Sequence, residues 1–109
     1  MNKEIKAKWV AALRSGDYKQ AKNQLRKTED GHDSFCCLGV LCDVINPDGW
    51  DDGNRFLGNM SLLPPDAMRI AGIDTLYVVH EHDRPHLTEL NDGRGLNFNQ
   101  IADLIEEQL

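Results

Sequence analysis

The sequence predicts a mainly helical α+β fold, and three features of the chain carry this prediction. Apolar residues recur at helical spacing near both ends of the chain. A continuous apolar run in the middle is long enough for a buried helix, and two turn-rich regions with apolar residues indicate a small antiparallel β element. With 109 residues, of which 40% are hydrophobic and 28% charged, we expect one compact domain over residues 1–109.

An N-terminal helical hairpin is expected first. Residues 3–14 form an amphipathic helix that ends at Ser15 and Gly16, because Gly takes the left-handed conformation after a helix. Its apolar face carries residues at spacing four: Ile5, Trp9 and Leu13. Asp17 then caps a second helix, with Gln20 three residues later as its capping-box partner. The buried stripe of that second helix consists of Tyr18, Ala21 and Leu25.

The run from Ser34 to Ile45 is apolar almost throughout, so periodicity alone fits either a buried strand or a buried helix. Asp33 or Ser34 as N-cap, and Pro47 just beyond the end, favour a central buried helix. Gly39 lies in its middle, where Gly costs about 1 kcal/mol relative to Ala. We therefore expect Gly39 to allow a close crossing with a neighbouring helix.

The small β element is expected around residues 50–57 and 76–80. Asp52 and Gly53 lie between Trp50 and Phe56, which is typical of a tight hairpin. Residues 76–80 form the strongest strand pattern of the chain.

Two further helices are indicated by their end signals. Pro65 follows another proline and opens a short helix that Gly72 closes. Near the C-terminus, Asn97 can cap a helix and Gln100 completes the capping box, so a C-terminal helix is expected to run to about Leu109.

The net charge is −6, but the cations are concentrated at the front of the chain. Residues 1–28 hold eight basic residues against Glu4 and Asp17, whereas the remainder holds four basic and sixteen acidic residues. This distribution excludes the uniformly basic footprint of a protein that binds nucleic acid directly. Two interpretations stay open: the front cations meet an anionic partner, or they balance carboxylates within the protein or between subunits.

Three features of the sequence bear on the cellular compartment of the protein. No stretch approaches the roughly 20 apolar residues of a membrane span, so no membrane partner is expected. The first residues lack the apolar core of a signal peptide, and three cysteines do not make a secreted disulfide framework. We therefore expect a protein of a reducing cytoplasm.

Several segments together resemble a family of small proteins encoded by tailed phages and prophages. They are Lys8–Gln20, Cys36–Asp43, Leu63–Pro65 with Gly72, and Leu90–Asp92 followed by Phe98–Ile105. The cysteine-rich segment is the most specific, and the similarity covers most of the chain. The resemblance implies a viral accessory protein that acts inside a bacterial cell, and it implies no reaction. The segment His80–His86 departs from the shared pattern.

Two side-chain clusters invite a catalytic or metal-binding interpretation. One combines a histidine with three cysteines, as in a Cys–His nucleophile or a zinc site: His32, Cys36, Cys37 and Cys42. The other places histidines at strand spacing: His80, His82 and, further on, His86. Buried cysteines that act as small hydrophobes, and solvated histidines, are the commoner arrangements. We therefore predict no catalytic residue, no metal site and no cofactor.

The expected ligand-binding residues combine cations with aromatic, amide and carboxylate side chains. They are Trp9, Arg14, Tyr18, Lys22, Arg26, Asn91 and Asp92. Arginine binds phosphate through two hydrogen bonds, and aromatic rings stack on bases, so this set fits an anion-accepting cleft. A place in the core competes with this role for Trp9, and it is the stronger interpretation of that residue.

These features predict a phage anti-defence protein that sequesters a nucleotide-derived host signal without catalysis, with a homo-oligomer as a way to build a shared pocket. One alternative is an acidic inhibitor of a host enzyme or nucleic-acid-binding protein, acting through carboxylates of Asp43–Asp52 and Glu81–Asp92. The other alternative is a hydrolase that depends on a cysteine or a metal.

Overall fold

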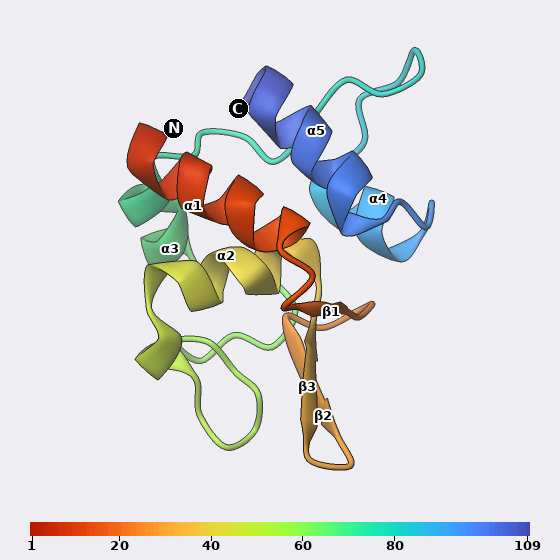
Figure 1. The fold of residues 1–109 in the computed structure, drawn as a ribbon. Helices are drawn as coiled ribbons and strands as arrows, with labels where there is room; N and C mark the ends of the chain where they lie inside the picture. The colour runs from red at the N-terminus through yellow and green to blue at the C-terminus, as the bar shows by residue number, and fades with distance from the viewer.

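Five α-helices and a small three-stranded sheet form the structure, a computed structural model that describes residues 1–109 (Figure 1). The helices are α1 Lys3–Arg14, α2 Cys37–Ile45, α3 Pro65–Ala71, α4 Leu87–Asp92 and α5 Phe98–Gln108, with a 3-10 turn (η1) at Pro47–Gly49. The strands are β1 Lys19–Gln20, β2 Arg26–Glu29 and β3 His32–Phe35. β3 lies in the middle of the sheet, antiparallel to β2 and parallel to β1. The predicted mainly helical α+β class is confirmed.

The core is one cluster of 24 buried residues with α2 at its centre. Every residue from Cys37 to Cys42 is buried, and α2 contacts α1, α3 and α4. α1 lies beside both α2 and α5 (Figure 1). Its Trp9 is fully buried, and the indole nitrogen donates to the carbonyl of Cys37 at 2.9 Å. None of the helices combines the length and apolar character that crossing a membrane requires.

The predicted helix ends are confirmed in α1, α3 and α5. α1 ends at Arg14, followed by Gly16 at φ +79°. α3 begins at Pro65 and ends before Gly72, which has left-handed backbone angles. Asn97 accepts from the backbone of Gln100, whose side chain accepts in return from the backbone of Asn97, so the capping box of α5 is complete.

The second helix of the predicted N-terminal hairpin is absent. Residues 17–25 instead carry the short strand β1, and the backbone N–H after it, on Ala21, donates to the carbonyl of Phe35 in β3 at 2.7 Å. Asn23 has φ +71°, a left-handed conformation that a helix cannot contain. Tyr18, Ala21 and Leu25, whose spacing predicted a helix, therefore lie in a non-helical segment that contains the short strand β1.

The central helix exists, but it begins later than predicted. Asp33 and Ser34 pair with β2 as part of β3, so neither caps α2. Cys36 is the N-cap, and its sulfur accepts from the backbone N–H of Gly39 at 3.4 Å. Gly39 does allow a close approach, but the neighbour is the backbone of Leu25 and not a helix.

The predicted β regions form single antiparallel bridges and no extended strands. Trp50 pairs with Phe56, and residues 76–87 make a narrow hairpin in which Tyr77 pairs with His86. The turn of that hairpin contains Glu81 and His82, both with positive φ. This turn breaks the expected alternation of the histidines, because His82 belongs to the turn and not to a strand. The three-stranded sheet over residues 19–35 was not predicted.

Candidate ligand-binding groove

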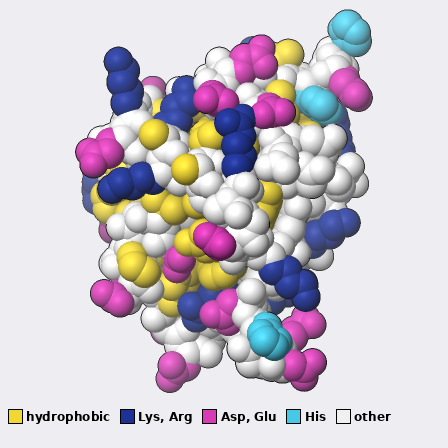
Figure 2. All heavy atoms as spheres, in the orientation of Figure 1, with side chains coloured by type: hydrophobic (Ala, Val, Ile, Leu, Met, Phe, Trp, Pro, Cys, Tyr) yellow, Lys and Arg dark blue, Asp and Glu magenta, His cyan; other side chains and the backbone are white.

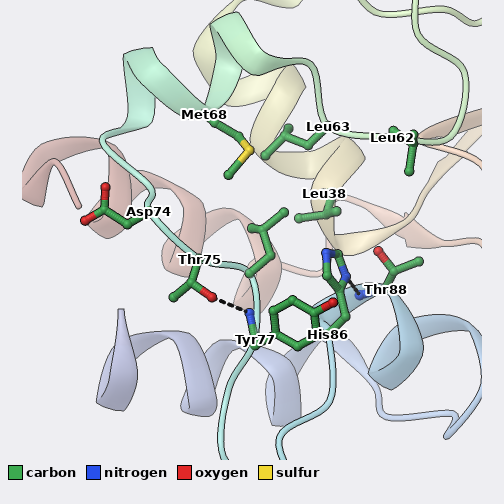
Figure 3. Close-up of a pocket in the computed structure, with 10 residues that line it drawn as sticks. Leu38, Leu62, Leu63, Met68, Asp74, Thr75, Tyr77, His86 and Thr88 are labelled. Carbon is green, nitrogen blue, oxygen red and sulfur yellow. Dashed lines mark hydrogen bonds between the residues drawn. The ribbon is translucent and has the colours of Figure 1, made fainter.

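A groove of about 320 Å³ opens between α2, α3 and the start of the 76–87 hairpin (Figure 3). Six of its ten lining residues are hydrophobic, and the full set is Leu38, Leu62, Leu63, Met68, Asp74, Thr75, Leu76, Tyr77, His86 and Thr88. Leu38 of α2 and Leu76 are buried, so the groove reaches the core. An apolar lining with a few polar groups is typical of small-molecule sites.

His86 is the best-oriented polar side chain of the groove. It is the N-cap of α4, and its Nδ1 accepts from the backbone N–H of Thr88 at 3.0 Å. Because Nδ1 accepts, a neutral ring carries its proton on Nε2. Partial burial lowers the pKa of His86, which favours this neutral form. Figure 3 shows the second ring nitrogen turned away from Thr88 and toward the groove, where it can donate to a ligand.

Tyr77 lies against His86 and completes an aromatic wall. The two rings meet edge to face with centroids 5.1 Å apart, an arrangement that adds to the packing energy. The backbone N–H of Tyr77 donates to the hydroxyl of Thr75, which fixes the chain beside the groove. The Tyr77 side chain is nevertheless 54% exposed, so ring surface stays accessible to a ligand.

The groove contains one formally charged residue. Asp74 lies at one end, and His86 with Thr88 lies at the other (Figure 3). Neither Lys nor Arg lines the groove. Acceptor and donor groups are therefore separated along an apolar surface, which is suited to a polar planar molecule more than to a strong anion.

The predicted ligand-binding residues do not form a single cleft. Trp9 and Asn91 are both completely buried. Asn91 has a structural role, since its side chain accepts from Gln20 and from the backbone of Cys37, and donates to Ala21 and Asp92. The competing assignment of Trp9 to the core is therefore confirmed, and the side-chain hydrogen bonds of Asn91 are all made within the protein.

The two arginines of the predicted set are engaged within the protein. Arg14 forms ion pairs with Asp103 at 2.6 Å and Glu106 at 2.8 Å. These hydrogen bonds raise the pKa of Arg14. Arg26 stacks over the ring of Trp50, 4.5 Å from its centroid. Basic and acidic side chains also alternate over the face seen in Figure 2. Internal charge balance, one of the two open interpretations, therefore accounts for Arg14.

Part of the predicted set does line a surface depression. Arg14 and Tyr18 border one shallow hollow and Lys22 borders the next, and the two hollows share Gln20 and Asn97. The Tyr18 hydroxyl donates to Asp43 at 2.6 Å, so it is already satisfied. Burial raises the pKa of Tyr18, with the Asp43 hydrogen bond as a further cause.

The cysteines have the character of core residues. Cys36, Cys37 and Cys42 are free thiols, and all three are buried. Burial raises the pKa of Cys36 to about 11 and that of Cys37 well above its ordinary value, so neither thiol is a nucleophile at neutral pH. His32 is exposed on β3. No group of three or more His, Cys, Asp and Glu side chains is arranged to hold a metal ion.

The groove escaped the sequence prediction because its residues come from four separate segments. The sequence presents His86 as a candidate metal ligand and Tyr77 as a strand residue. One available signal was His86 immediately before Leu87-Thr88, where it serves as a helix cap. This signal is weak because His is a less usual cap than Ser, Thr, Asp or Asn.

The comparisons with known proteins give a family and no named relative. No curated protein and no solved structure matches the chain. A family model described as "Domain of unknown function (DUF8296)" matches residues 1–109, the whole chain. The protein therefore belongs to the DUF8296 family.

Proposed function

We propose that the protein is a phage accessory protein that captures a nucleotide-derived signal of its bacterial host, in the host cytoplasm, and leaves it chemically unchanged. The resemblance of the segments Cys36–Asp43 and Leu90–Asp92 to phage and prophage proteins supports the setting. The single observation that supports the ligand class is the pair Tyr77–His86 on the wall of an apolar groove. Aromatic rings and one directed N–H donor suit the face and edge of a nucleobase.

Capture without reaction fits the side chains around the groove. The groove contains no cysteine or lysine nucleophile, and the neutral His86 has its Nδ1 occupied by the backbone of Thr88. A general base needs a free acceptor nitrogen beside the reacting group. His86 is therefore suited to bind a ligand rather than to remove a proton from it.

Calorimetry and native mass spectrometry test this proposal together. The protein is purified from cells that carry a nucleotide-based defence system, and the retained mass and the oligomeric state are read in one spectrum. Calorimetry then uses cyclic nucleotides, ADP-ribose derivatives and nucleosides. The proposal is supported if one of these compounds binds and His86→Asn weakens that binding. The control His82→Asn, in the turn of the hairpin, should leave the affinity unchanged. No retained small molecule, together with no heat from any compound, refutes it.

A second candidate function is inhibition of a host protein through surface contacts. Large apolar side chains are exposed next to the groove and along the hairpin: Leu62 at 72%, Tyr77 at 54% and Val79 at 52%. Exposed apolar groups of this size are typical of protein interfaces. Two of the carboxylates expected to mimic nucleic acid are already engaged within the protein. Asp83 pairs with Arg94, and Asp43 accepts hydrogen bonds from Tyr18 and Trp50. A stoichiometric host protein retained on the purified chain, with no small molecule, favours this candidate.

A further inference from the structure

Resting on the proposed function, we infer that the groove receives the uncharged base and sugar of its ligand and discriminates against a phosphate group. The protein then prefers a nucleoside to the corresponding nucleotide. Three features of the groove lead to this selectivity: its charge, the positions of its polar groups and its size.

The charge of the groove disfavours phosphate. Asp74 is the only formally charged lining residue, and no lysine or arginine is present to compensate a phosphate dianion. Two like charges a few ångströms apart repel each other even near a protein surface, where screening reduces the effect. Arg69 of α3 does not line the groove, and it pairs with Asp66.

The polar groups of the groove match the two ends of a nucleoside. At one end, the Nε2–H of His86 can donate to a ring nitrogen or a carbonyl of the base. Asp74 lies at the other end, where Figure 3 shows its carboxylate turned away from the other labelled side chains, so it can accept from sugar hydroxyls or an exocyclic amine that reach the rim of the groove. The base then lies over Leu38 and Leu76 and against the exposed ring surface of Tyr77. A site that hydrogen-bonds a ligand in this way discriminates strongly against compounds that lack the matching groups.

The size of the groove limits the ligand to one nucleoside unit. Its volume of about 320 Å³ is near the lower end of the range of small-molecule sites. A second base or a long phosphate bridge would extend past Asp74 into solvent. The groove is therefore suited to a mononucleoside and not to a dinucleotide.

The test compares each nucleoside with its own 5′-monophosphate at one pH and low salt. Adenosine with AMP and cytidine with CMP are titrated into the wild type and the variants by calorimetry. We expect the nucleoside to bind about tenfold more tightly than the monophosphate. Asp74→Asn should raise the affinity for the monophosphate and so bring the ratio of nucleoside affinity to monophosphate affinity closer to one. Asp66→Asn on α3, outside the groove, is the matched control and should leave the ratio unchanged.

The outcomes separate this inference from the function on which it rests. If the monophosphate binds as tightly as the nucleoside or more tightly, or if Asp74→Asn leaves the ratio unchanged, the selectivity inference is wrong and ligand capture stands. If no nucleoside, nucleotide, cyclic nucleotide or ADP-ribose derivative binds, the proposed function itself fails, and the inference fails with it. Chemical shift changes of Tyr77 and His86 on adding adenosine locate the binding in the groove.

Discussion

Replacing Gly39 by alanine tests the contact that positions α2 in the core. A Cβ atom at this position would lie 1.7 Å from the carbonyl oxygen of Leu25, a distance that real Cβ atoms do not show. The backbone of Leu25 must retreat by roughly 1.3 Å to relieve the overlap. This movement weakens two hydrogen bonds, from the N–H of Leu25 to Met60 and from the N–H of Cys36 to Leu25.

The magnitude follows from opposing contributions. Overpacking destabilises by about 1–3 kcal/mol, and the two weakened hydrogen bonds add about 1 kcal/mol each. Alanine in place of glycine stabilises an isolated helix by about 1 kcal/mol. We expect Gly39→Ala to lower the free energy of unfolding by about 2–4 kcal/mol, a large part of the stability of a small domain.

Urea denaturation followed by tryptophan fluorescence measures this change. The control is Gly53→Ala in an exposed turn, where a Cβ would come no closer than 3.4 Å to another group and φ is not positive. We expect that variant to stay within about 0.5 kcal/mol of the wild type. An alanine at position 39 that leaves stability unchanged or raises it would show that helix propensity, and not the Leu25 contact, governs this site.

Three further predictions concern the groove and the buried amide. His86→Asn keeps an acceptor for the Thr88 N–H but removes the ring. The melting temperature should therefore change little, while the nucleoside affinity measured by calorimetry falls roughly 10- to 100-fold. A variant that melts well below the wild type, or that binds nucleoside as tightly, contradicts this prediction. Because burial lowers the pKa of His86 from its ordinary value of 6.5, the neutral ring contributes stability above that pH, and the contribution is lost as the pH falls through the folded pKa. The denaturation midpoint should therefore fall more between pH 7.5 and pH 5.5 in the wild type than in His86→Asn. If the two proteins show the same fall, His86 is not the source of this pH dependence. Asn91→Ala leaves the N–H of Cys37 and the carbonyl of Ala21 without their side-chain partner, so urea denaturation should show a loss of about 2–5 kcal/mol, against less than about 0.5 for the exposed Asn99→Ala.

Local signals in the sequence predicted the elements whose ends are determined by neighbouring residues. Gly16, Gly72 and the Asn97–Gln100 capping box end or begin helices through contacts within a few residues, and all three predictions are confirmed. The class of the fold follows from the same elements. Such signals work because the backbone groups at a helix end are satisfied locally.

Residues 17–25 do not form the predicted helix because their partners lie further along the chain. β1 pairs in parallel with β3, and Ala21 donates to Phe35, contacts that apolar spacing alone cannot reveal. The same reason explains why the sequence did not reveal the internal partners of the expected ligand-binding residues. Arg14 meets Asp103 across 89 positions, and Asn91 contacts Gln20 across 71. Tertiary pairing decided these positions, whereas periodicity describes only one segment at a time.

The network around Asn91 joins the N-terminal end of α2 to α4. Asn91 bonds the first turn of α2, so Cys36–Asp43 and Leu90–Asp92 form one buried unit. Apart from Leu38, neither segment lines the groove. The Asn91 network and the groove are thus built from largely different positions, so a substitution in the groove leaves the contacts between α2 and α4 in place. The ligand preference of the groove can therefore change while the buried framework that supports it stays the same.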